Sequence, residues 1–322
     1  MTTMTTFLLL RETRANETRV ALTPKDISLL LQNHVDIAFC VEQGAGVKAG
    51  FDDAQYEQIG ANIRKTVSDT DDNNVKSFQR LFAGVDVIIR AKRANARREA
   101  AEIAAMRPGM ILIGSLDVRE RACDAEGAVQ EAPHVVALRQ AGVVFHSIDL
   151  LDLPRNDPGN LLSVMSQLTG PLAVQESVCR FKAMHHNAPQ SLALIGFGVA
   201  SEAAFHSVLT EENDEFAKIN IVSTASGADR ARKSIKTHEN NHKCSIQVFS
   251  YEADDGLPTM QQIVRDAVCD VDIVVTSARR NNASAPLLID DDTLKLMKRG
   301  CVVCDLAGLL LINGDVAILT IF

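Results

Sequence analysis

Residues 191–206, SLALIGFGVASEAAFH, place a short apolar run, a glycine pair and a helix-like pattern one after another. The run Leu192–Ile195 has the length and apolar character of a buried strand, and Gly196-Phe-Gly198 interrupts it. Apolar side chains then recur from Val199 to Val208 at a spacing that puts them on one side of a helix. The sequence therefore predicts a strand, a tight turn and a helix.

A strand, glycine turn and helix in this order are typical of a dinucleotide site. Glycines let the backbone turn sharply and approach a pyrophosphate, which accepts hydrogen bonds from N–H groups at the helix N-terminus. We therefore predict that Gly196, Gly198, Val199 and Ala200 contact a nucleotide cofactor. Ser201 stands where the fingerprint has a third glycine or an alanine, so the match is partial and a purely structural turn is the alternative.

Strand and helix patterns alternate along the rest of the chain. We expect strands at 7–10, 37–41, 85–91, 110–113 and 143–148, and beyond residue 191 at 219–222, 245–249, 271–276 and 301–304. Thr23 and Pro24, a capping residue and a first-turn proline, predict a helix start. Residues 123–133 are acidic and loop-like, and 66–74 resemble a surface insertion. The alternation favours an α/β fold with parallel sheets.

The clearest interruption of this pattern is Asp149–Gly159. A long helical pattern follows, which we expect to bridge two domains; its apolar positions are Leu161, Val164, Leu168, Leu172, Val178 and Phe181. The expected organisation is residues 1–155 as the first domain, 156–187 as a linking helix, 188–308 as a dinucleotide-binding domain and 309–322 as an apolar tail.

The composition is that of a globular protein, with 46% hydrophobic and 23% charged residues among 322. A net charge of -8 supplies no basic surface for nucleic acid. No apolar run approaches the roughly 20 residues that span a bilayer, and residues 1–14 lack the basic region of a secretory signal. We therefore expect a cytoplasmic protein without membrane insertion.

We expect neither metal nor disulfide chemistry. The histidines of 237–243 lack carboxylate or cysteine partners at ligand spacing, and His185-His186 lie at a helix end. The seven cysteines are scattered and mostly set in apolar runs, which indicates reduced, buried thiols. Cys301 and Cys304 form a C-x-x-C inside a valine-rich strand, which favours packing over redox chemistry.

The segment Glu12–Pro24, ETRANETRVALTP, is more specific than the glycine turn. It resembles the opening motif of the alanine dehydrogenase and pyridine nucleotide transhydrogenase family, to which saccharopine dehydrogenase and N5-(carboxyethyl)ornithine synthase are related. Further blocks agree in order at 41–53, 86–92, 196–204 and 272–305. The resemblance implies two Rossmann-like domains with parallel sheets and a cleft between them, the first holding substrate and the second the nicotinamide nucleotide.

The resemblance also implies roles for residues of the first domain. Arg19 corresponds to the arginine that binds the substrate carboxylate, and a guanidinium suits this task because it binds a carboxylate bidentately. Lys92 corresponds to the active-site lysine. Asp117 stands where alanine and saccharopine dehydrogenases have a catalytic histidine, and an aspartate beside a lysine is a poor acid near neutral pH. Without the motif, Arg19 and Lys92 would be ordinary solvated side chains.

Further positions are assigned to the nucleotide. Arg155 and Ser163 lie where transhydrogenase has nicotinamide-contacting residues, and Ser277 and Ala278 follow the strand at 271–276. An NAD enzyme should have a carboxylate at the end of the second strand of its nucleotide domain. This chain has Ser223 and Thr224 there, followed by Arg230, so the expected cofactor is NADP or NAD.

The leading hypothesis is an NAD(P)-dependent oxidoreductase that acts on the carbon–nitrogen bond of a small amino acid, with a 2-oxo acid or its imine as the reducible substrate. The alternatives are a hydride-transfer component like the transhydrogenase alpha subunit and a relative without turnover. The chain ends before the segment with which family members return to the first domain. We expect the tail 309–322 to form a hairpin that covers the first domain or pairs with a second subunit, giving a homodimer.

Overall fold

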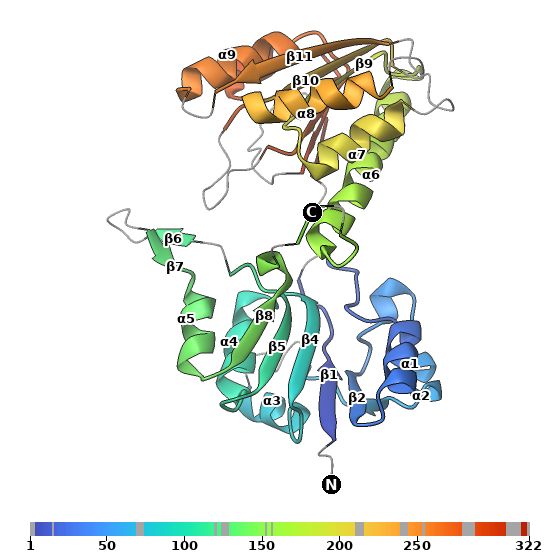
Figure 1. The fold of residues 1–322 in the computed structure, drawn as a ribbon, viewed down its shortest axis with the longest axis vertical. Helices are drawn as coiled ribbons and strands as arrows, with labels where there is room; N and C mark the ends of the chain where they lie inside the picture. The colour runs from blue at the N-terminus through green and yellow to red at the C-terminus, as the bar shows by residue number, and fades with distance from the viewer. Residues whose placement is uncertain are drawn as a thin grey trace. The chain divides into compact units, whose positions relative to one another are not determined.

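The computed structural model describes residues 4–14, 16–68, 74–118, 121–123, 129–151, 153–155, 157–209, 216–238, 244–252, 255–278, 287–306 and 317–320. The chain divides into two compact units, Met1–Asp152 and Leu153–Phe322 (Figure 1). None of the helices described is both long and apolar enough to cross a membrane.

The first unit contains a parallel sheet in the order β3-β2-β1-β4-β5-β8. Its strands are β1 (Thr5–Leu9), β2 (Ile37–Glu42), β3 (Asn62–Arg64), β4 (Val87–Lys92), β5 (Ile111–Ser115) and β8 (Val144–Ser147). The order runs outward from β1 in one direction and then from β4 in the other. Polar loops that follow β1 and β4 therefore meet at a switch point, where doubly wound folds bind ligands.

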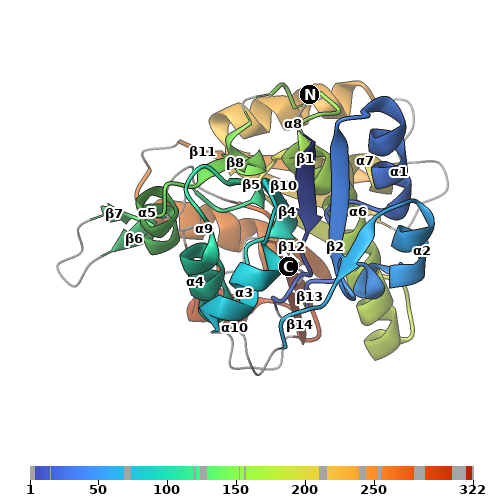
Figure 2. The same ribbon diagram turned by 90° about the horizontal axis from the view of Figure 1, so that it is seen from below.

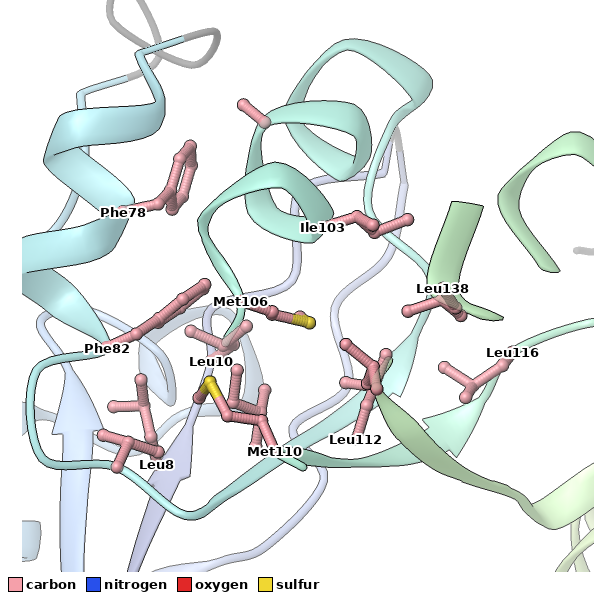
Figure 3. Packing of buried hydrophobic residues seen from close by; sticks show 14 of the residues in the cluster. Leu8, Leu10, Phe78, Phe82, Ile103, Met106, Met110, Leu112, Leu116 and Leu138 are labelled. Atoms are coloured by element: carbon pink, nitrogen blue, oxygen red, sulfur yellow. The ribbon is translucent and has the colours of Figure 1, made fainter. Parts of the chain in front are cut away.

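Helices cover both faces of this sheet (Figure 2). α1 (Pro24–Asn33) and α2 (Asp53–Gln58) lie on one face, and α3 (Val75–Leu81), α4 (Ala96–Ala105) and α5 (Pro133–Gln140) on the other, with short turns η1 (Val47–Ala49) and η3 (Ile148–Leu150). Thr23 caps α1 as predicted, because its side chain accepts from the Asp26 N–H while the Asp26 carboxylate accepts from the Thr23 N–H. Figure 3 shows the helix side chains Phe78 and Ile103 above the strand side chains Leu8 and Leu112.

The second unit repeats the same strand order, β11-β10-β9-β12-β13-β14. Its strands are β9 (Ser191–Ile195), β10 (Lys218–Thr224), β11 (Ser245–Tyr251), β12 (Ile273–Thr276), β13 (Val302–Asp305) and β14 (Ala317–Thr320). α6 (Leu161–His185), α7 (Val199–Val208) and α8 (Ala225–Lys236) pack on one face, and α9 (Leu257–Val268) and α10 (Asp291–Leu296) on the other (Figure 1). Two doubly wound parallel sheets confirm the predicted fold class.

One local prediction is wrong, and a second lies partly outside the described residues. Residues 123–133 were expected as a loop, but β6 (Arg121–Cys123) and β7 (Val129–Glu131) pair as an antiparallel ribbon whose strands are too short to leave a periodic pattern. The tail was expected as a hairpin on the first domain or a second subunit. Its described part, β14, instead pairs in parallel with β13 of the second unit, where the edge of the sheet offers unpaired backbone groups. Residues 309–316 lie outside the described part.

The long helix buries only part of the expected stripe, at Val178 and Phe181. Leu161, Leu168 and Leu172 are exposed, whereas the buried positions are Ser163, Gly170, Ala173, Val174, Ser177, Val178 and Phe181. Small residues line this stripe because α6 packs closely on α7: a Cβ atom at Gly170 would overlap the Ala200 carbonyl oxygen. α6 therefore belongs to the second unit, whose contacts it shares.

The cysteines of β13 behave as packing residues. Cys301 and Cys304 are buried, and burial raises the pKa of the Cys301 thiol to about 12 and that of Cys304 to about 11. Both thiols therefore stay protonated at neutral pH and are poor nucleophiles. Cys40 is buried as expected, but Cys179 is exposed on α6, so the prediction of buried thiols is wrong there.

Substitution of Gly170 tests the close approach of α6 and α7. Alanine is the better helix former by about 1 kcal/mol, yet we expect Gly170→Ala to lower stability by about 1–3 kcal/mol, because overpacking forces backbone shifts. Thermal melting followed by circular dichroism measures the change. Leu172→Ala, on the exposed side of the same helix, is the control and should change stability by about 0.5 kcal/mol or less. A stabilised Gly170→Ala variant would contradict the packing described.

Candidate active site

The charged centre of the first unit lies where β4 and β5 end. The register between these strands shifts after Ile89, and Lys92 then pairs with Ser115. Lys92 Nζ donates to Asp117 Oδ1 at 2.7 Å and to Ser115 Oγ at 3.4 Å. The ammonium is thus held between two groups that β5 and its following loop supply.

Asp117 adopts an unusual backbone conformation, with a φ angle of 51°. Aspartate tolerates this left-handed region better than most residues, but such positions still carry strain and cluster at functional sites. Its Oδ2 atom is buried without a hydrogen-bond partner among the described residues, and Arg14 Nη2 lies 3.6 Å from it. Lys92 and Arg14 thus both face the Asp117 carboxylate, and the charge of Lys92 also acts on Glu17 in the loop after β1.

The loop after β1 is fixed to the end of β4 by Glu12. This buried carboxylate accepts hydrogen bonds from the backbone N–H groups of Ala91 at 2.6 Å and Lys92 at 3.2 Å. Burial raises the pKa of Glu12, even though Arg90 and the two N–H groups act in the opposite direction. The contact sets the position of the segment that carries Arg14.

A buried ion network lies beneath this loop. Arg98 donates to both oxygens of Glu42, at 2.9 and 2.7 Å, and to Glu102 at 2.6 Å, and Arg90 pairs with Glu102 as well. Glu42 also accepts from the backbone N–H of Arg11 at 2.9 Å. The network therefore connects β2, β4 and α4 to the start of the loop.

Arg19 forms a bidentate pair with Glu17, at 2.8 and 2.6 Å. Burial alone would raise the pKa of Glu17. The hydrogen bonds and charge of Arg19 outweigh this effect and hold the pKa of Glu17 below its usual value. The guanidinium predicted to bind a substrate carboxylate thus already has a carboxylate partner within its own loop.

Arg14 and Ser115 belong to the cluster around Asp117, but the sequence analysis did not identify them. Arg14 lies inside the motif at 12–24, and its spacing alone does not distinguish it from Arg19.

The glycine turn of the second unit has the predicted geometry at Gly196. Its φ angle is 88°, and a Cβ atom there would lie 2.9 Å from the Ala278 nitrogen. Ser277 and Ala278 therefore lie against the turn, and Ser277 Oγ is 2.7 Å from Ser201 Oγ. Ser201 thus connects α7 to the end of β12, across the switch point between β9 and β12.

The N-terminus of α7 fits a pyrophosphate. Gly198 is the N-cap residue and has no side chain that could cap the helix. Nothing lies within 4 Å of where a Cβ atom would stand on Gly198. The amides of Val199 and Ala200 belong to the first turn, whose N–H groups have no partner within the helix. Open space and unused donors are what an anionic cofactor requires.

The residues at the end of β10 are engaged with the turn itself. Ser223 Oγ accepts from the Phe197 N–H at 3.2 Å, and Arg230 Nη2 donates to the Phe197 carbonyl at 2.9 Å. Thr224 caps α8 by accepting from the Gly227 N–H.

Two further predicted cofactor contacts lie at or just before the start of α6. Asn160 caps this helix by accepting from the Ser163 N–H. Ser163 is buried, and Arg155 is exposed. Cofactor contacts for these residues stay a prediction.

Two doubly wound units, one with a glycine turn at its switch point, define the class of two-domain dinucleotide-type α/β proteins. The family model "Alanine dehydrogenase/PNT, N-terminal domain" matches residues 8–169, and the corresponding C-terminal domain model matches 186–308. The chain belongs to the alanine dehydrogenase/PNT family, which confirms the resemblance in the sequence.

Two relatives show how far the likeness extends. The chain is 25% identical to the NAD(P) transhydrogenase subunit alpha of Cereibacter sphaeroides, over 92% of this chain and 54% of that protein. It is also 25% identical to the alanine dehydrogenase of Bacillus subtilis, over 92% of this chain and 69% of that protein. The chain thus spans only about half the length of the transhydrogenase subunit.

Solved structures share the fold. A transhydrogenase from Sinorhizobium meliloti superposes with a TM-score of 0.69 at 21% identity, covering 98% of this chain and 86% of that chain. An L-alanine dehydrogenase gives a TM-score of 0.62 at 19% identity, covering 94% and 74%. At these identities the likeness establishes the architecture and not the reaction.

The backbone strain at Asp117 can be tested apart from its charge. Asp117→Gly and Asp117→Ala both remove the carboxylate, but only alanine must hold the left-handed conformation, at a cost of about 1–2 kcal/mol. We expect the glycine variant to be the more stable one in urea denaturation. At an ordinary φ angle, alanine would be the more stable, since glycine loses more chain entropy on folding. That reversed order would contradict the geometry at Asp117.

Proposed function

We propose that the protein is an NAD(P)-dependent oxidoreductase that acts on the carbon–nitrogen bond of a small amino acid, reducing a 2-oxo acid or its imine in the reverse direction. The observation that supports this most is the Lys92–Asp117–Arg14 cluster at the ends of β4 and β5. It places an ammonium and a guanidinium beside one another, which can stabilise developing negative charge and bind the carboxylate of a 2-oxo acid.

The chemistry follows from these groups. A nicotinamide nucleotide held at Gly196, Gly198 and the first turn of α7 would supply the hydride that the carbonyl or imine carbon accepts. Lys92 donates a hydrogen bond to the oxygen or nitrogen that gains negative charge, and so stabilises the transition state. Asp117 holds the ammonium in place through its Oδ1 atom. Ser115 provides the second acceptor that fixes the direction of the ammonium.

The substrate carboxylate requires a guanidinium. Arg19 is the residue that the family resemblance assigns, and it presents a bidentate fork that Glu17 now occupies. Arg14 is the second candidate, because its Nη2 atom lies 3.6 Å from Asp117 Oδ2, on the same carboxylate that Lys92 contacts. We propose that both arginines contribute, Arg14 at the cluster and Arg19 by exchange of its Glu17 contact for the substrate.

A screen of 2-oxo acids, each with ammonia or a primary amine, tests the proposed reaction by the loss of NAD(P)H absorbance. Turnover with a small 2-oxo acid that requires the amine supports it. Hydride transfer between two nucleotides without any oxo acid would support the second candidate, a component like the transhydrogenase alpha subunit. The aspartate at position 117, where the dehydrogenases that the sequence resembles have a histidine, favours that candidate.

Substitutions separate the binding and chemical roles. We expect Arg14→Lys and Arg19→Lys to raise the KM for the oxo acid about tenfold or more at unchanged nucleotide affinity, because an ammonium cannot reproduce the bidentate fork. Lys92→Ala should instead lower kcat. Steady-state kinetics and nucleotide titration measure both effects. If one arginine variant behaves like the wild type, the other arginine is the anchor; if all three do, the site is misplaced.

Cofactor choice depends on the end of β10. No carboxylate stands at residues 222–225 to repel a 2′-phosphate, whereas Arg230 and Ser223 hydrogen-bond Phe197 of the glycine turn. We therefore propose that NADPH binds at least as tightly as NADH. Fluorescence titration with each nucleotide at the same ionic strength measures the ratio. A clear preference for NADH would show that a carboxylate elsewhere takes the ribose hydroxyls.

The assembly and location of the protein also remain proposals. We propose a cytoplasmic homodimer, in keeping with the acidic net charge of -8 and the apolar side chains exposed on α6. Light scattering of the purified chain over a range of concentrations measures the oligomeric state.

A further inference from the structure

Two histidines outside the proposed active site face each other on the helical layer of the second unit. His206 lies near the end of α7 and His238 directly after α8, and both are partly exposed. His206 Nδ1 is 3.3 Å from His238 Nε2. The buried Phe205 presents its ring edge-on to both imidazoles and supports them from below.

The hydrogen bonds of the remote ring nitrogens fix which atoms are left for a ligand. His238 Nδ1 is 3.0 Å from the Ser234 carbonyl oxygen, and a carbonyl only accepts, so this nitrogen carries the proton. The facing Nε2 atom of the neutral ring therefore bears a lone pair. His206 Nε2 is 3.1 Å from Ser234 Oγ, which can accept its proton and leave Nδ1 with a lone pair too.

This arrangement is the one that metal-binding histidines use. Such histidines generally donate the second ring N–H to a backbone carbonyl or another oxygen, which orients the ring and selects the tautomer. Ser234 provides both acceptors, one from its backbone and one from its side chain.

The distances also agree with a shared ion. Zinc–nitrogen bonds of about 2.0–2.1 Å at a tetrahedral angle put two ligand nitrogens about 3.3–3.4 Å apart, and the observed separation is 3.3 Å. The ring centroids are only 4.8 Å apart and the planes are inclined by 44°. The line from each nitrogen to the centre of its ring is therefore inclined to the line that joins the two nitrogens.

We propose that His206 and His238 together bind a borderline divalent cation, such as Zn²⁺, Ni²⁺ or Cu²⁺, and thereby connect the ends of α7 and α8. Imidazole nitrogen suits these ions, and Ca²⁺ or Mg²⁺ would prefer oxygen. In the described part of the chain no group of three or more histidine, cysteine, aspartate or glutamate side chains gathers around an ion, so water completes the coordination. The site is independent of the proposed oxidoreductase activity.

Calorimetric titration of Ni²⁺ into the tag-free, chelator-treated full chain tests the proposal. The wild type should bind one ion through this pair. His206→Gln and His238→Gln should each weaken that binding about tenfold or more, because each removes half of the protein ligands. His34→Gln, which removes an exposed histidine of the first unit, is the control and should bind as the wild type does.

Thermal melting provides a second measurement. Saturating Ni²⁺ should raise the melting temperature of the wild type and of His34→Gln but not of the two pair variants, since a ligand stabilises only a fold that binds it. If His206→Gln proves unstable without metal, His238→Gln at the exposed end of α8 decides the result alone. A wild type that binds no Ni²⁺, or pair variants that bind it unchanged, would show that the two rings share only a hydrogen bond.

Discussion

The ion network around Arg98 determines where the loop after β1 in the first unit can lie. Arg98 is fully buried between Glu42 of β2 and Glu102 of α4, and Glu42 in turn holds the backbone at Arg11. Breaking a buried pair by removal of one partner leaves an uncompensated charge and costs about 3–5 kcal/mol. A well-packed apolar replacement could match its stability. An apolar replacement would lack the directed hydrogen bonds of the ion network, which fix one position of the loop that carries Arg14 and Arg19.

The repeated strand order explains why charged groups gather at one edge of each sheet. In both units the order reverses next to the first strand, so the loops after two neighbouring strands diverge and leave room for a ligand. In the first unit this edge carries Lys92 and Asp117, and in the second it carries Gly196 and Ser277. The same topology thus gives one unit a cluster of charged side chains and the other the backbone amides of a helix N-terminus.

Much of this was predictable from sequence because it rests on local chemistry. The capping of α1 by Thr23, the turn at Gly196 and the start of α7 depend on residues within a few positions of one another. Most of the buried stripe of α6 could not be predicted from such local signals. Leucines gave the more apolar pattern, but Gly170 and Ser177 face the sheet and α7, because close helix packing selects small side chains over large ones.

The charged cluster shows a second limit of the sequence. The motif at 12–24 contains Arg14, Glu17 and Arg19 within six positions, and nothing in their spacing says which charge neutralises which. In the folded chain Arg19 pairs with Glu17, while Lys92 pairs with Asp117, a residue 25 positions further along. Arg14 lies 3.6 Å from that same aspartate, whose second oxygen lacks a hydrogen-bond donor among the described residues. The fold, and not the spacing within the motif, therefore decides which of the two arginines lies beside Lys92 and Asp117.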